Sequence, residues 1–271
     1  MDLLFFKVSL TVYLISTLGY VLSLLAKRIL VARISTWIMA VAFVLHSIYL
    51  ITRYLHIGYS PVLSQYDTLS FFTWVLAGIY LILQFKTKTR VLGAFVSPVT
   101  SLLMIMASVG LGGAVSIPES LRGGLVPIHV VLSVTGEALF VMASCAGAMY
   151  LIQDGFIKRR KLNPLSRLLP SLRDLDRINH FCLLTGFPLL TMGVLAGSIW
   201  ARVVWGSLWQ WDPKQVWTLA AWFFYAVLLH QRLAIGWKGH KAALFSILSL
   251  VILLVSLLFV NRYFPTVHSF V

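Results

Sequence analysis

Acidic residues are scarce in this sequence of 271 residues, which has 8 Asp and Glu beside 22 Lys and Arg. Charged residues make up 11% of the chain, whereas a soluble domain has about 25%. So small a share excludes an ordinary water-soluble domain of this length. Cysteine is scarce as well, because only Cys145 and Cys182 are present and both fall in apolar segments. The sequence therefore contains no disulfide framework and no CxxC redox motif, and we expect both cysteines to be small buried hydrophobic residues.

Apolar residues are abundant, at 59% of the chain, and occur in blocks long enough to cross a bilayer. A transmembrane helix needs about 20 such residues. We therefore predict an all-α, polytopic integral membrane protein that forms one transmembrane domain over residues 1–271, with about eight spans. The first block has no small-residue cleavage site, so we expect it to remain a span and not to be a cleaved signal peptide. The predicted spans are 3–25, 34–52, 68–85, 91–109, 127–151, 179–203, 214–234 and 242–260.

Basic residues alternate between dense and sparse from one predicted loop to the next. Most of the Lys and Arg follow the first, third, fifth and seventh spans, and the connection 152–178 holds the largest group. By the positive-inside rule these four loops face the cytoplasm, and both termini face the outer side. The charge thus predicts orientation, with some attraction to anionic membrane lipid, and no nucleic-acid partner. We expect a short surface helix within 152–178.

The outer loop 203–213 is crowded with tryptophan. Trp205, Trp209 and Trp211 lie within seven residues and are joined by small residues that include Gly206. Tryptophans at the headgroup level can simply anchor a membrane protein. A flat aromatic surface of this density also suits a large planar ligand with a few polar edges, such as a porphyrin or a quinone. The residues alone leave both interpretations open.

The residues that follow the tryptophans predict the start of a helix. Asp212 can be the N-cap, Pro213 the first helical residue and Gln215 the reciprocal partner in a capping box. This pattern gives Asp212 a purely structural explanation beside any role in binding. In the preceding span, Gly193 and Gly197 form a GxxxG pattern that permits close approach of helices, although this pattern is common in membrane proteins.

The seven histidines differ in predicted depth. His129 opens a span at the outer surface and His268 lies in the outer tail, so both share a side of the membrane with the tryptophans. Two imidazoles on opposite faces give six-coordinate haem iron with little room for oxygen to bind. Each of them could equally be a solvated or hydrogen-bonded surface histidine. No role is assigned to His56 or His240.

His230 lies about 16 residues below Lys214, or roughly 24 Å along a helix, near the inner end of its span. It cannot share one iron with the outer pair, and an ionisable residue within the membrane is a functional candidate. Its candidate partners are His46, His180 or a residue of another chain. Glu137, an acidic residue well inside a span, is either a hydrogen-bonded structural group or a group that supports a ligand.

The segment Trp205-Gly-Ser-Leu-Trp-Gln-Trp-Asp212 is similar to the WGxxWxWD signature of haem-handling membrane proteins of cytochrome c maturation. Together with Gly186-Phe-Pro-Leu-Leu-Thr-Met-Gly193, Leu229-His230 and His268-Ser269, it resembles the CcsA (ResC) family, whose members are subunits of the system II cytochrome c synthetase. The resemblance is strongest over 180–271 and thin over the first hundred residues. Two features depart from the family: Gln215 replaces a usual Glu, and the loop 60–67 lacks the usual Asn and Glu.

The resemblance implies a role for each matching residue. His129 and His268 match the outer histidines that hold haem iron, and His230 matches the histidine of a deeper haem site. The second ligand of that deeper site comes, in the family, from a partner subunit named CcsB. The residues that match the segment positioning haem at the outer face are Trp205, Gly206, Trp209, Trp211 and Asp212.

The function implied is cytochrome c biogenesis. The chain is expected to bind haem b, move it from His230 to the outer face and present it for thioether attachment to the CxxCH peptide of apocytochrome c. Such a chain is a holocytochrome c synthetase (haem lyase) subunit that acts with a CcsB-type partner in a bacterial inner membrane or, alternatively, a chloroplast thylakoid membrane. Positioning and ligation would carry the reaction, so no catalytic nucleophile or acid/base pair is expected from this chain. The alternatives are a haem delivery protein, a HemX-type regulator of haem synthesis, and a quinone-binding or structural membrane subunit.

Overall fold

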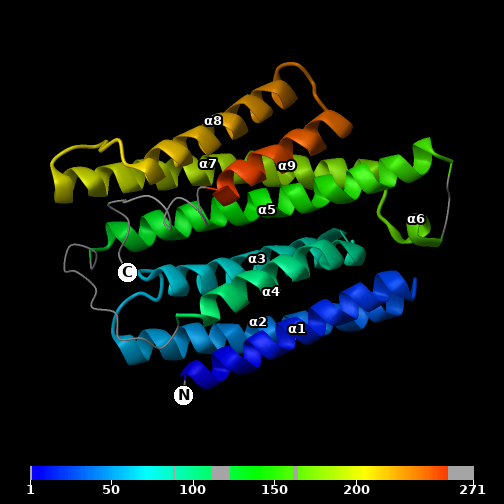
Figure 1. The fold of residues 1–271 in the computed structure, drawn as a ribbon, viewed down its shortest axis with the longest axis horizontal. Coiled ribbons are helices and arrows are strands. Elements are labelled where there is room, and N and C mark those ends of the chain that lie inside the picture. The colour runs from blue at the N-terminus through cyan, green and yellow to red at the C-terminus, as the bar shows by residue number, and fades with distance from the viewer. Residues whose placement is uncertain (1, 88, 111–122, 161–163, 256–271) are drawn as a thin grey trace. The chain divides into compact units, whose positions relative to one another are not determined.

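The computed structural model describes residues 2–87, 89–110, 123–160 and 164–255. Every regular element in these ranges is a helix (Figure 1), which confirms the predicted all-α class. A short helix, α6, lies in the basic connection where one was expected. The elements are α1 (Asp2–Leu25), α2 (Ile29–Ile57), α3 (Gln65–Thr87), η1 (Arg90–Leu92), α4 (Gly93–Ser108), α5 (Leu125–Lys158), α6 (Pro164–Leu168), α7 (Leu172–Trp205), α8 (Pro213–Leu233) and α9 (His240–Val255).

Six helical segments among the described residues are long and apolar enough to cross a membrane. They are α1, α2, α3, the segment Arg90–Ser108 that joins η1 to α4, α5 and α7, and α9 adds a shorter apolar helix. Helix α8 occupies the seventh predicted span over 21 residues but is not among the six. Its ends carry Lys214, Gln215, His230, Gln231 and Arg232, which lower its hydropathy. The polytopic membrane class is confirmed, while the count of eight spans and the outward orientation of the termini stay predictions.

The helices group into two compact units. The single transmembrane domain expected over residues 1–271 stays a prediction. Unit 1 contains Met1–Val115 and Ile152–Ser171, and unit 2 contains Ser116–Leu151 and Leu172–Val271. Within unit 1, α1 packs along α2, and α4 packs against α1 and α3 (Figure 1). Hydroxyl groups join these helices in the core, where the Tyr20 and Tyr80 hydroxyl oxygens lie 2.7 Å apart. Gly93 at the start of α4 lies directly against the Tyr20 ring and the Tyr80 hydroxyl, so a larger residue there would clash with both side chains.

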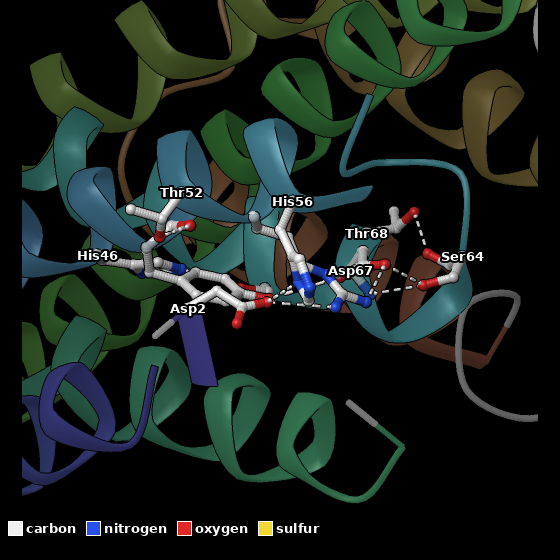
Figure 2. Close-up of polar contacts among 10 residues, drawn as sticks. Asp2, His46, Thr52, His56, Ser64, Asp67 and Thr68 are labelled. Atoms are coloured by element: carbon white, nitrogen blue, oxygen red, sulfur yellow. Dashed lines mark hydrogen bonds and ion pairs between the residues drawn. The ribbon is translucent and has the colours of Figure 1, made fainter. Parts of the chain in front are cut away.

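A buried ion-pair cluster joins three helices of unit 1 (Figure 2). Arg53 of α2 pairs with Asp2 of α1 at 3.4 Å and with Asp67 of α3 at 3.3 Å. Ser64 accepts a hydrogen bond from the Asp67 N–H at 3.1 Å and donates to its carboxylate at 2.7 Å, which caps α3. The ring of His56, which is 72% exposed, lies 3.4 Å from Asp2. Ser64 and Asp67 thus hold the start of α3 against α2.

Unit 2 is built by α7, α8, α9 and the part of α5 up to Leu151. Helices α5 and α7 run antiparallel and touch through glycine, because a Cβ on Gly136 would lie 2.8 Å from the Leu190 backbone nitrogen. Helix α8 packs on α5 through a stacked pair, Phe140 and Tyr225, with ring centroids 3.6 Å apart. Both cysteines are buried, as expected.

Candidate functional site

His129 lies near the N-terminal end of α5, and its ring packs against the glycine face of α7. Its Nδ1 is 2.7 Å from the carbonyl oxygen of Gly193. A Cβ added to Gly197 would stand 2.7 Å from Nδ1 and 2.8 Å from Cε1 of the same ring. The imidazole therefore fills the space that any side chain at position 197 would need. The GxxxG pattern of α7, which the sequence left without a function, makes room for a candidate ligand.

The charged side chain of Lys214 lies near this imidazole in unit 2. Lys214, in the first turn of α8, is close enough to interact electrostatically with His129 and with Glu137 of α5. Glu137 also interacts with Tyr225 of α8. Asp212 adds a negative charge near Lys214. Sequence reasoning gave Lys214 no role, although a lysine two residues after an acidic N-cap in a membrane helix was a usable signal.

The tryptophan segment, residues 205–211, runs from the last residue of α7 to the residue before the N-cap of α8. The rings of Trp209 and Trp211 meet edge to face at 5.8 Å and 90°, and Trp205 meets Trp200 at 4.8 Å and 76°. These ring pairs are therefore not coplanar, and both the ligand surface and the membrane anchor stay hypotheses. Edge-to-face pairs place the positive edge of one ring on the negative face of another, which favours this arrangement. Trp211 is 79% exposed, so its ring is open to a partner or ligand.

The helix start after the tryptophan segment differs in one respect from the prediction. Asp212 is the buried N-cap of α8, its side chain accepts from the Lys214 N–H at 3.1 Å, and proline follows as the first helical residue. The capping box is wrong, because Gln215 Oε1 accepts from the N–H of Gln210, at 2.9 Å, and not from that of the N-cap. Trp211 has φ +54, which turns the chain sharply between these two N–H groups. Gln215 thus ties the tryptophan segment to α8.

His230 and His180 do not form a pair. His230 lies in the last turn of α8 with its side chain exposed, roughly 24 Å along the helix from Lys214. Nδ1 of His180 accepts a hydrogen bond from Nε of Arg232 at 3.2 Å. The same guanidinium donates to Asp176 Oδ1 at 3.1 Å. No hydrogen bond or electrostatic interaction joins the two histidines in the described part of unit 2.

The remaining histidines are distributed over both units and the tail. His46 is fully buried in unit 1, where its Nε2 lies 2.9 Å from Ser70 Oγ and its Nδ1 lies 3.4 Å from the Tyr13 hydroxyl. With both nitrogens within hydrogen-bond distance of hydroxyl groups, His46 packs as a core residue in this structure. His240 is the first residue of α9. His268 lies outside the described residues, so its role as the second outer ligand stays a prediction.

The sequence matches the model of the family described as cytochrome c assembly protein over residues 62–268. Three similar proteins are each named cytochrome c biogenesis protein CcsA. That of Trieres chinensis is 30% identical over 250 residues, 81% of this chain and 80% of the relative. That of Guillardia theta is 29% identical over 277 residues, 95% and 92% of the two chains. That of Synechocystis sp. is 26% identical over 273 residues, 80% and 82% of the two chains. Because the family match covers more than half of the sequence and one relative is 30% identical over 81% of it, the chain belongs to the cytochrome c assembly protein family.

Proposed function

We propose that the chain binds haem b at the end of unit 2 that holds the tryptophan segment, with His129 and His268 as iron ligands. The observation that carries the proposal is the geometry of His129, whose Nδ1 is bonded to the Gly193 carbonyl. This end of the unit also presents Trp211 and the cation of Lys214. A planar apolar ring with carboxylate edges matches this combination of groups. We place this end at the outer face of the membrane.

Haem is the substrate of this site, and the residues hold it for attachment to apocytochrome c. Two imidazoles would keep the iron six-coordinate and closed to oxygen. The histidine of the CxxCH peptide would then displace one of them. Each peptide S–H adds across a vinyl C=C bond, with sulfur joining one carbon and hydrogen the other. The addition has no leaving group and no net redox change, so positioning is the main contribution of this chain, as a synthetase subunit.

We further propose that His230 ligates haem at the inner end of α8, with the second ligand supplied by a CcsB-type partner subunit. The His230 side chain is exposed, and in the described residues no hydrogen bond engages it. Val216 and Phe223 precede it at intervals of seven residues, share its face of α8 and are exposed as well. This face is available to a partner in the membrane, which we take to be a bacterial inner membrane, with the thylakoid membrane as the alternative.

The test is the absorption spectrum of the full chain, co-expressed with its CcsB-type partner and purified in detergent with haem supplied. We expect a six-coordinate haem spectrum that loses intensity or changes ligation in His129→Ala. The matched control is His56→Ala, an exposed histidine of unit 1, which should leave the spectrum unchanged. A wild-type protein without haem would refute the proposal and favour the quinone-binding alternative. Full haem occupancy together with a normal cytochrome c yield in His129→Ala would also refute the proposal, because His129 would then not be a ligand.

A further inference from the structure

We propose that Gly193 and Gly197 preset the His129 imidazole as its Nδ1–H tautomer, so that Nε2 is ready to bind iron before haem arrives. The two glycines are positioning residues that act through His129. This inference rests on the proposed function, in which His129 is an iron ligand. It adds which nitrogen binds, what fixes that choice, and why α7 needs glycine at these positions.

The hydrogen bond determines the tautomer. A backbone carbonyl oxygen has no proton to give, so at 2.7 Å the Nδ1 of His129 must be the donor. In a neutral imidazole the lone pair then lies on Nε2, which is the nitrogen that can bind a metal. Within the described ranges no hydrogen bond occupies Nε2 of this ring. The ring thus offers a metal-binding atom without first having to exchange a proton or break a bond.

Two other helical histidines provide the contrast. A guanidinium can only donate, so Nδ1 of His180 accepts from Arg232 and the proton of the neutral ring is on Nε2. Both ring nitrogens of His46 lie within hydrogen-bond distance of hydroxyl groups. Of these three histidines, the one held by a carbonyl is the one prepared as a ligand through Nε2.

The register of α5 on α7 explains the two glycines. In an α-helix the carbonyl of one residue points toward the residue four positions later. Position 197 is four residues after Gly193, so its glycine leaves the Gly193 carbonyl open to the ring of His129. One turn along α5, Ser133 packs directly on Gly193, where a Cβ would lie 2.9 Å from the Ser133 backbone nitrogen. The glycine at 193 therefore brings the two backbones close, and the glycine at 197 admits the ring.

In metal sites of proteins, a histidine that binds the metal through one ring nitrogen usually donates a hydrogen bond from the other nitrogen. The partner of that nitrogen fixes the ring orientation and raises the basicity of the ligand, and its loss typically lowers metal affinity about 10- to 100-fold. Gly197→Ala places a Cβ within 2.8 Å of the ring and must displace it. We therefore expect haem affinity in this variant to fall by about 10- to 100-fold, although the histidine itself is retained.

The matched control is Gly136→Ala. Its Cβ would lie 2.8 Å from the Leu190 nitrogen and 2.9 Å from the Gly186 carbonyl, so it perturbs the same pair of helices without touching His129. We expect Gly136→Ala to keep the wild-type haem spectrum and affinity, and Gly197→Ala to lose them. Free imidazole added to Gly197→Ala should restore a six-coordinate spectrum. An equal loss of affinity in both variants would mean that helix packing alone matters, and would overturn the proposal.

A second measurement tests the tautomer of His129 directly in the haem-free chain. The ¹⁵N spectrum of the full chain, labelled at histidine and free of haem, should show one ring with a protonated Nδ1 and an unprotonated Nε2. This pair of signals should be absent from His129→Gln. A His129 ring protonated at Nε2, or averaging between tautomers, would refute the inference even if haem binding still required His129. Haem ligation that is unchanged in His129→Ala would instead refute the proposed function, whatever the tautomer.

Discussion

The hydrogen bond from Gln210 N–H to Gln215 Oε1, at 2.9 Å, closes the tryptophan segment onto the first turn of α8. Gln215→Ala removes the acceptor, and losing one such bond costs about 1 kcal/mol. Local opening of the segment should then be about fivefold more populated. Gln215→Glu should act in the opposite direction. Its carboxylate keeps the acceptor, makes a stronger charge-assisted bond and gains about 0.3–1 kcal/mol from the N-terminus of the helix. Repulsion from Asp212 opposes this gain by only about 0.2–0.5 kcal/mol.

The assay is amide hydrogen exchange of the haem-free chain in detergent, followed at Gln210. Exchange should be about fivefold faster in Gln215→Ala and slower than wild type in Gln215→Glu. The Trp217 amide, inside α8, serves as the internal control and should not change. Unchanged exchange at Gln210 in Gln215→Ala would show that this hydrogen bond does not close the segment. Faster exchange in Gln215→Glu would show that the repulsion from Asp212 outweighs the helix terminus.

Two further predictions concern the partners of the buried arginines Arg53 and Arg232. Arg53→Met removes the guanidinium that pairs with the buried carboxylates of Asp2 and Asp67, and should lower the free energy of unfolding by about 3–5 kcal/mol, measured by detergent titration. Arg53→Lys should lose less, and an unchanged stability for Arg53→Met would contradict the cluster's role. His180→Gln keeps an acceptor for the guanidinium beside it, so we expect both haem signals to be retained in the absorption spectrum. A change of ligation at the inner haem in His180→Gln would show that this residue is a ligand after all.

The helices follow directly from hydropathy, because a chain in a bilayer must satisfy its backbone hydrogen bonds internally. Their ends were harder to predict. Helix α2 continues past its apolar block to Ile57, since Arg53 is satisfied by carboxylates from two other helices. Helix α7 begins at Leu172, before its apolar block, where Asp176 pairs with Arg232. Hydropathy locates the apolar part of a helix, whereas these polar ends depend on partners that are far away in the sequence.

Of the candidate site, the sequence could predict which side chains take part but not the backbone groups that they contact. The histidine at 129 and the tryptophans could be assigned to one side of the membrane from their positions in the spans. The hydrogen bond from His129 to the Gly193 carbonyl could not be predicted, because every residue has a backbone carbonyl and residue types do not show which one is used. The pattern becomes informative once α5 and α7 are considered together. His129 and Ser133 are one turn apart on α5, and their partners Gly197 and Gly193 are one turn apart on α7 in the opposite direction. A GxxxG pattern by itself indicates only close approach of helices. Where it faces a histidine of an antiparallel helix, as here, it leaves a backbone carbonyl within hydrogen-bond distance of Nδ1 of the ring.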